Sequence, residues 1–223
     1  MLAMSFFDVK NYRMVETFEL KAWERMLTRG YVWDSYFLTL GRAALAALVA
    51  SLVAFPAAWL LAFRASETQR RWAIFLLVIP FFTSYLVRTF SWLVILAESG
   101  VVNAGLGAFG LGPYTMLNTG FGTLVGYLTL VLPLVLILQT VTLAHIDPRL
   151  PAAARNLGCP PGRVIWEVVL PLAKTGLVVA ALFAFILSFG DFVAPYYLGG
   201  SKPPTLPILI IDTTKSGQQW PRA

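Results

Sequence analysis

Four polar and aromatic side chains recur at helical spacing inside an otherwise apolar segment. They stand at positions i, i+3, i+4 and i+7, on one face of a helix: Tyr85, Arg88, Thr89 and Trp92. A charge inside a membrane segment costs at least about 2.5 kcal/mol at its centre, so such residues face protein or water. Either this face lines a pathway for a solute, or Arg88 pairs with Asp191 or with backbone carbonyls and orients the helices.

A second set of side chains lies near the end of the last long apolar run. Asp191 precedes Tyr196 and Tyr197, so a carboxylate and two aromatic faces stand close together in the sequence. These groups suit an amine, because a cation is attracted to the face of an aromatic ring. Asp191 fits two places, the pathway itself or an outer rim that meets another protein. An arginine would repel a polycation, which favours the orienting role for Arg88 if the solute is one.

The sequence contains no set of residues that could run a reaction. We find no paired carboxylates, no nucleophile with a base and no metal-ligand cluster, since the chain has one histidine and one cysteine. The nucleotide-binding pattern G-x-x-x-x-G-K-[ST] is also missing. We therefore predict no enzyme activity, no catalytic residue and no metal or cofactor bound by this chain.

The elements that position these residues are long apolar helices. The composition is 58% hydrophobic and 13% charged, which is typical of a membrane protein. Runs of about 20 apolar residues can span a bilayer. We predict an all-α, polytopic helical membrane protein, a single transmembrane domain over 1–223, with four spans: 35–63, 72–97, 119–144 and 176–198. Pro80 and Pro133 are expected to kink their helices, and Gly122 and Gly126 to let helices approach closely.

The basic residues predict the orientation of the spans and argue against nucleic acid. The net charge is +6, but the basic residues are scattered among loops, which favours anionic lipid as their partner. Segment 64–71 holds three Lys or Arg residues and segment 145–174 holds four, whereas 98–118 holds none. The first two are therefore expected in the cytoplasm and the third outside.

The polar segment 145–174 has the features of a docking loop. Asp147 and Pro148 are expected to start a short helix that ends near Gly158. Its apolar positions recur at helical spacing, on a face that nothing nearby in the chain covers: Leu150, Ala153, Ala154 and Leu157. A second short helix is expected after Pro161, interrupted at Pro171.

This loop resembles the EAA loop of ABC importer permeases. The family pattern is Glu-Ala-Ala, three residues, Gly, nine residues, Ile-x-Leu-Pro, and the spacing matches throughout. Ala152 replaces the usual Glu, which removes its ionic contact, and Val168 replaces Ile. The resemblance implies a site for coupling to an ATPase, carried by eight residues: Ala152, Ala153, Ala154, Leu157, Gly158, Val168, Leu170 and Pro171.

Two further segments resemble the spermidine/putrescine-type, binding-protein-dependent permeases. They are residues 79–92, IPFFTSYLVRTFSW, and residues 188–200, SFGDFVAPYYLGG. The resemblance implies a type I transmembrane fold in a bacterial-type inner membrane and ATP-driven import, with polyamines or a related small solute as cargo. The implied partners are a cytoplasmic ATPase dimer that holds ATP and Mg, a second permease and an extracytoplasmic solute-binding protein.

Family members have about six spans, so this chain is expected to lack one at each end. Residues 1–7 resemble the tail of a first family helix and residues 218–221 the lead-in to a last one. The alternative function is a stand-alone ion-coupled carrier or channel. That class requires buried coupling carboxylates, for which Asp191 is the one candidate.

Overall fold

The computed structural model describes residues 8–10, 13–15 and 21–215, and these residues are mainly helical. Strands β1 (Asp8–Lys10) and β2 (Arg13–Val15) pair in antiparallel fashion, and α1 (Lys21–Thr28) follows them. The expectations for residues 1–7 and 218–221 lie outside the described residues.

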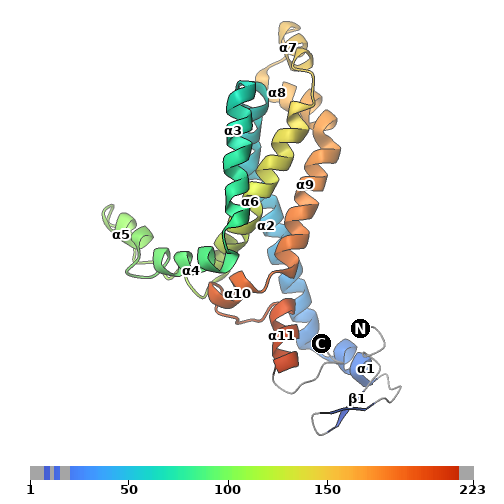
Figure 1. Ribbon diagram of the computed structural model, residues 1–223, viewed down its shortest axis with the longest axis vertical. Coiled ribbons are helices and arrows are strands. Elements are labelled where there is room, and N and C mark those ends of the chain that lie inside the picture. The colour runs from blue at the N-terminus through green and yellow to red at the C-terminus, as the bar shows by residue number, and fades with distance from the viewer. Residues whose placement is uncertain (1–7, 11–12, 16–20, 216–223) are drawn as a thin grey trace. The chain divides into compact units, whose positions relative to one another are not determined.

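Three helices of the described chain are long and apolar enough to cross a membrane (Figure 1). They are α2 (Gly30–Phe63), α6 (Gly120–Ala144) and a continuous helix over Pro161–Gly190. This last helix comprises α8 (Pro161–Val164), a π-helical segment η3 (Ile165–Val169) and α9 (Leu170–Gly190). A bent helix pair adds a fourth crossing if the pair is one span.

The span expected at 72–97 is this bent pair rather than one straight helix. It consists of α3 (Glu67–Val78), the 3-10 turn η2 (Ile79–Phe82) and α4 (Tyr85–Ile95), with a bend of 92°. Pro80 lies in η2, and Thr83 takes an extended conformation while its N–H donates to the Pro80 carbonyl. The kink expected at Pro80 is therefore present, whereas α6 continues through Pro133.

The last expected span, 176–198, is displaced towards the N-terminus. The helix begins at Pro161, fifteen residues earlier, and ends at Gly190. Asp191 ends it, because both carboxylate oxygens accept backbone N–H groups of the next helix, α10 (Val193–Tyr197). Side chains that bond to local backbone groups offer the chain an alternative to the continuing helix.

The described chain divides into two compact units. Residues 43–91 and 124–188 form one of them, in which α2, α6 and α9 lie side by side (Figure 1). Alanines line α2 and α9 where they meet the valines of α6, so the backbones approach closely, as in membrane helix packing. The buried cluster consists of Ala47, Ala50, Ala54, Val131, Val135, Ala180 and Ala184.

Two further contacts fix the packing of this unit. A Cβ atom added at Gly176 of α9 would lie 2.2 Å from the Oγ1 atom of Thr142 on α6, so only glycine fits there. The buried Gln139 donates from Nε2 to the carbonyl oxygen of Ser51 at 3.1 Å, which joins α6 to α2.

The other unit comprises the described parts of residues 1–42, 92–123 and 189–223. It contains α5 (Val101–Gly107), α10 and α11 (Leu206–Lys215). Thr39 of α2 accepts the N–H of Leu206 at 2.8 Å and so caps α11. The N–H of Asn118 donates to the Leu198 carbonyl, and a Cβ at Gly122 would lie 2.6 Å from the same oxygen. The close approach expected at Gly122 is thus to a loop backbone.

Candidate functional site

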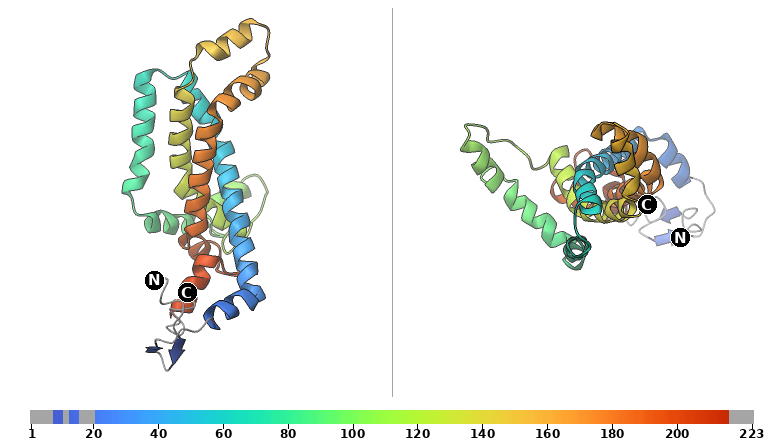
Figure 2. Two further views of the ribbon diagram at one scale, coloured as in Figure 1. Left: turned by 90° about the vertical axis from the view of Figure 1, so that its right-hand side faces the viewer. Right: turned by 90° about the horizontal axis from the view of Figure 1, so that it is seen from above.

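The first helix of the segment expected to dock a partner is α7 (Arg149–Asn156). Pro148 is its N-cap residue, and the Asp147 carboxylate accepts the N–H of Arg149 at 2.9 Å. The expected helix over 148–157 is therefore present to within one residue at each end. Figure 2 (left) shows α7 and α8 joined by a turn.

The turn after α7 is a Schellman motif built on Gly158. The N–H of Cys159 donates to the Ala154 carbonyl at 3.1 Å, and that of Gly158 to the Arg155 carbonyl at 2.9 Å. Gly158 has a φ of +85°, in the left-handed region that favours glycine. A Cβ added there would meet nothing within 4 Å, so the requirement for glycine comes from the backbone conformation alone.

An apolar surface follows from this arrangement. Leu150 is 47% exposed, Leu157 88% and Trp166 73%, and α7 lies in contact with η3. We call Leu150, Ala153, Leu157 and Trp166 the docking surface. The sequence predicted its α7 half and missed Trp166, although a tryptophan between Arg163 and Glu167 in a polar loop was a signal for it.

The expectation that Pro171 interrupts the second helix of the loop is wrong. The helix passes through Pro171, and the N–H of Leu170 donates to the Ile165 carbonyl, five residues back. In a regular helix the ring of Pro171 would clash with the Glu167 carbonyl. The π turn changes the geometry at this point and accommodates the proline. Arg163 and Glu167 also pair at 2.6 Å on the exposed side.

The remaining residues of the expected coupling site differ in exposure. Ala152 and Ala153 are exposed and Ala154 is half-buried, as expected for a helix that covers little of its own chain. Val168 and Leu170 are half-buried, while the neighbouring Val169 is fully buried in a cluster with residues of α6 and α9. The loop is therefore anchored through η3 and presents α7 outwards.

The face of α4 expected to line a pathway is turned towards protein. Tyr85 donates from its hydroxyl to the Gly126 carbonyl of α6 at 3.4 Å, and Arg88 donates from Nη1 to the Thr129 carbonyl at 3.1 Å. Thr89 is fully buried, and Trp92 is half-buried. The guanidinium of Arg88 also lies 5.8 Å from the centre of the Tyr85 ring. These bonds match the interpretation in which Arg88 orients helices through backbone carbonyls.

Asp191 has an equally local set of bonds. It is 8% exposed, and it accepts the N–H groups of Val193 at 2.9 Å and Ala194 at 3.1 Å. The structure brings Asp191 near the start of α10, and Tyr196 and Tyr197 lie at the end of that helix with their rings 5.0 Å apart.

Comparison with known proteins identifies the family. Residues 50–218 match the profile of the binding-protein-dependent transport system inner membrane component. The chain belongs to this family. It is a permease subunit of an ABC importer and a multi-pass protein of the inner membrane, with the type I importer fold.

Two curated relatives resemble this permease over most of its length. The inner membrane ABC transporter permease protein YdcU of Escherichia coli strain K12 is 29% identical over 213 residues, 89% of this chain and 68% of that protein. The spermidine/putrescine transport system permease protein PotB of Haemophilus influenzae is 28% identical over 192 residues, 85% of this chain and 65% of its own length.

A solved structure has the same fold. It is the crystal structure of a bacterial ABC transporter involved in the import of the acidic polysaccharide alginate, with a TM-score of 0.61 and 22% sequence identity. The match covers 96% of this permease and 72% of that chain. It supports the fold and carries no information on the solute of this permease.

Proposed function

We propose that this permease couples ATP hydrolysis on a cytoplasmic ATPase dimer to the import of a polyamine such as spermidine or putrescine. The docking surface carries the proposal. Leu157 is 88% exposed at the end of α7, directly before the left-handed turn at Gly158. Exposed apolar residues of this kind mark a protein interaction site.

The ATPase supplies the chemistry and this chain supplies the mechanical link. ATP and Mg are held by the ATPase subunits, which receive α7 in a groove. The buried Val169 joins the loop to α6 and α9, so that movement of α7 is passed to these helices. A second permease completes the pathway, and an extracytoplasmic binding protein delivers the solute.

The polyamine cargo rests on the relatives and on the arginine. Relatives with 26–28% identity over most of this chain are named as spermidine/putrescine permeases. Arg88 donates to a backbone carbonyl of α6, which is compatible with a cationic solute because the charge is used in helix packing.

Uptake by the reconstituted complex tests the proposal. We expect labelled spermidine or putrescine to enter proteoliposomes that hold this permease, the second permease, the ATPase and the binding protein when ATP is supplied to the ATPase. We expect no uptake when a proton or sodium gradient replaces ATP. Uptake that follows the ion gradient instead would favour the stand-alone carrier and overturn the proposal.

Co-purification of the ATPase with the permease tests whether the docking surface is the coupling site. Leu157→Asp should abolish it while the permease still inserts in the membrane, because a charge enters the apolar surface. Leu111→Asp is the matched control, since Leu111 is also exposed but lies outside the docking surface. Retention of the ATPase by Leu157→Asp would contradict docking at α7.

A further inference from the structure

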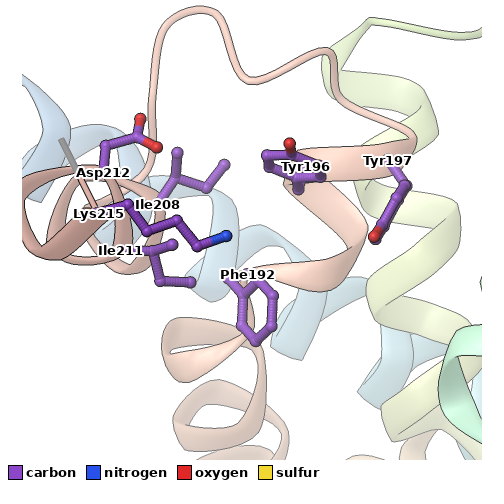
Figure 3. Close-up of a pocket in the computed structure, with 7 residues that line it drawn as sticks. All are labelled: Phe192, Tyr196, Tyr197, Ile208, Ile211, Asp212 and Lys215. Atoms are coloured by element: carbon purple, nitrogen blue, oxygen red, sulfur yellow. The ribbon is translucent and has the colours of Figure 1, made fainter.

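A pocket between α10 and α11 combines aromatic rings with one carboxylate and one ammonium group. It is a small, partly open depression of about 100 Å³, below the ~300–1,000 Å³ usual for a whole small-molecule site, so it suits one end of a solute. Figure 3 shows the side chains around it. Those used below are Phe192, Tyr196, Tyr197, Ile208, Asp212 and Lys215.

Both walls of the pocket are fixed by contacts within the same unit. Asp191 holds the start of α10 through two backbone N–H groups. Thr39 caps the start of α11 through Leu206, and Ile208 is 2% exposed, so this helix is anchored by its buried face. The starts of both helices are therefore held by hydrogen bonds within this unit.

The lining suits an alkylammonium ion. Phe192 and Tyr196 present partly exposed aromatic surface, and ammonium groups are attracted to ring faces within about 6 Å. Asp212 adds a carboxylate to the same pocket. In contrast with Asp191, which is nearly buried at a helix start, Asp212 is exposed. Asp212 is thus an exposed carboxylate among the residues that line the pocket.

The chain itself places an alkylammonium group at the wall of this pocket. Lys215 lies one turn after Asp212 on α11, and Figure 3 shows its side chain reaching across towards Phe192. A lysine side chain is a four-carbon chain that ends in a primary ammonium group. It has the same chemistry as one end of a diamine, and its tether gives it an effective concentration in the millimolar range.

We propose that this pocket is an alkylammonium subsite of the permease and that the ammonium group of Lys215 competes with the solute for it. A diamine or longer polyamine displaces the Lys215 ammonium group, and its own ammonium group lies against Phe192 and Tyr196, near Asp212. The proposal rests on the proposed polyamine cargo, which it refines by naming the residues that meet the amine.

Competition by a tethered lysine has a measurable consequence. The apparent dissociation constant equals the intrinsic one divided by the fraction of pockets that are vacant. If Lys215 fills the pocket about nine-tenths of the time, its removal strengthens amine binding about tenfold. A substitution that merely damaged the structure would weaken binding, so the expected sign separates the two explanations.

The experiment is calorimetric titration of the purified permease–ATPase complex, without binding protein, with butane-1,4-diamine. Omission of the binding protein matters because uptake kinetics include its own affinity. Lys215→Met should strengthen binding several-fold, and Asp212→Asn should weaken it several-fold. Lys202→Met and Asp34→Asn are the matched controls, because both remove an exposed charge outside the pocket and should leave binding unchanged. Butane-1,4-diol, which lacks the charges, should not bind.

The outcomes separate this proposal from the proposed function. Unchanged or weaker binding in Lys215→Met overturns the role of Lys215, and unchanged binding in Asp212→Asn overturns the subsite. If polyamine import occurs but both variants bind like the wild type, the pocket proposal alone fails. If binding shifts as expected while no polyamine is imported, the subsite stands and the polyamine cargo fails.

Discussion

The guanidinium of Arg88 donates to the backbone carbonyl of Thr129 at 3.1 Å, and this bond joins α4 to α6 directly after the 92° bend. One turn earlier on both helices, Tyr85 donates to the Gly126 carbonyl. Two donors three residues apart thus meet two acceptors three residues apart. The pair holds the start of α4 against α6, where a charge would otherwise be costly.

Replacement of Arg88 should therefore act on stability. Arg88→Met keeps most of the apolar stem and removes the donors, with an expected loss of about 1.5–3 kcal/mol, the value of a hydrogen bond from a charged group. Arg88→Lys retains the charge and should recover part of this loss. Denaturation of the purified complex in detergent measures both. Arg64→Met, at an exposed site, should leave the stability unchanged. Equal stability of Arg88→Met and the wild type would contradict a stabilising role for the bond between Arg88 and Thr129.

We predict that ATPase binding depends on the left-handed backbone conformation of Gly158. Gly158→Val should weaken ATPase binding, since a left-handed conformation costs about 1–2 kcal/mol for an ordinary L-residue and more for a β-branched one. Gly158→Asn should be nearly neutral, because asparagine tolerates this region and the space around the site is open. The measurement is ATPase co-purification at matched expression. Equal binding by the two variants would show that φ at this position is unimportant.

We predict that a larger residue at Gly176 disturbs the packing of α9 against α6. Gly176→Ala should destabilise the protein by about 1–3 kcal/mol, as overpacking does, because the new Cβ would overlap Thr142. Gly41→Ala in α2 is the control, since nothing lies within 4 Å and alanine is the better helix former. Thermal unfolding in detergent should show opposite shifts for the two variants. A Gly176→Ala protein as stable as wild type would mean that the helices separate without cost.

We predict that Asn103 stabilises the segment that follows α4. It is 5% exposed and donates to the carbonyls of Ala97 and Tyr114, while its Oδ1 accepts the Tyr114 N–H. Asn103→Ala leaves these backbone groups unpaired, so hydrogen exchange and proteolysis over 98–114 should become faster. Asn103→Asp keeps the acceptor and should give an intermediate effect. Unchanged exchange in Asn103→Ala would contradict the anchoring role.

Sequence periodicity predicted the helices well but could not predict how prolines act in three dimensions. Pro80 and Pro171 have the same chemistry, yet one accompanies a 92° bend and the other lies within a continuous helix. The difference comes from neighbouring backbone geometry, an extended Thr83 in the first case and a π turn in the second. Neither the extended conformation of Thr83 nor the π turn can be predicted from the pattern of residue types.

The helix face on α4 and the turn at Gly158 were predictable because each depends on local spacing. The pocket between α10 and α11 was not predictable, since it is lined by residues of two separate helices. In the sequence, Asp191 lies closer than Asp212 to Tyr196 and Tyr197. Its preference for the backbone N–H groups of Val193 and Ala194 becomes visible only in the structure. Residue spacing does not predict which charged residues from distant parts of the chain come together.

The π turn at η3 has a consequence for insertions and deletions. A π turn holds one residue more than the α-helical turn it replaces, so the helix could lose one residue within Ile165–Val169 and keep the faces on either side in phase. The ring of Pro171 would then meet a carbonyl of a regular α-helical turn. The extra residue and the proline therefore depend on each other. A deletion here is tolerable only together with replacement of Pro171.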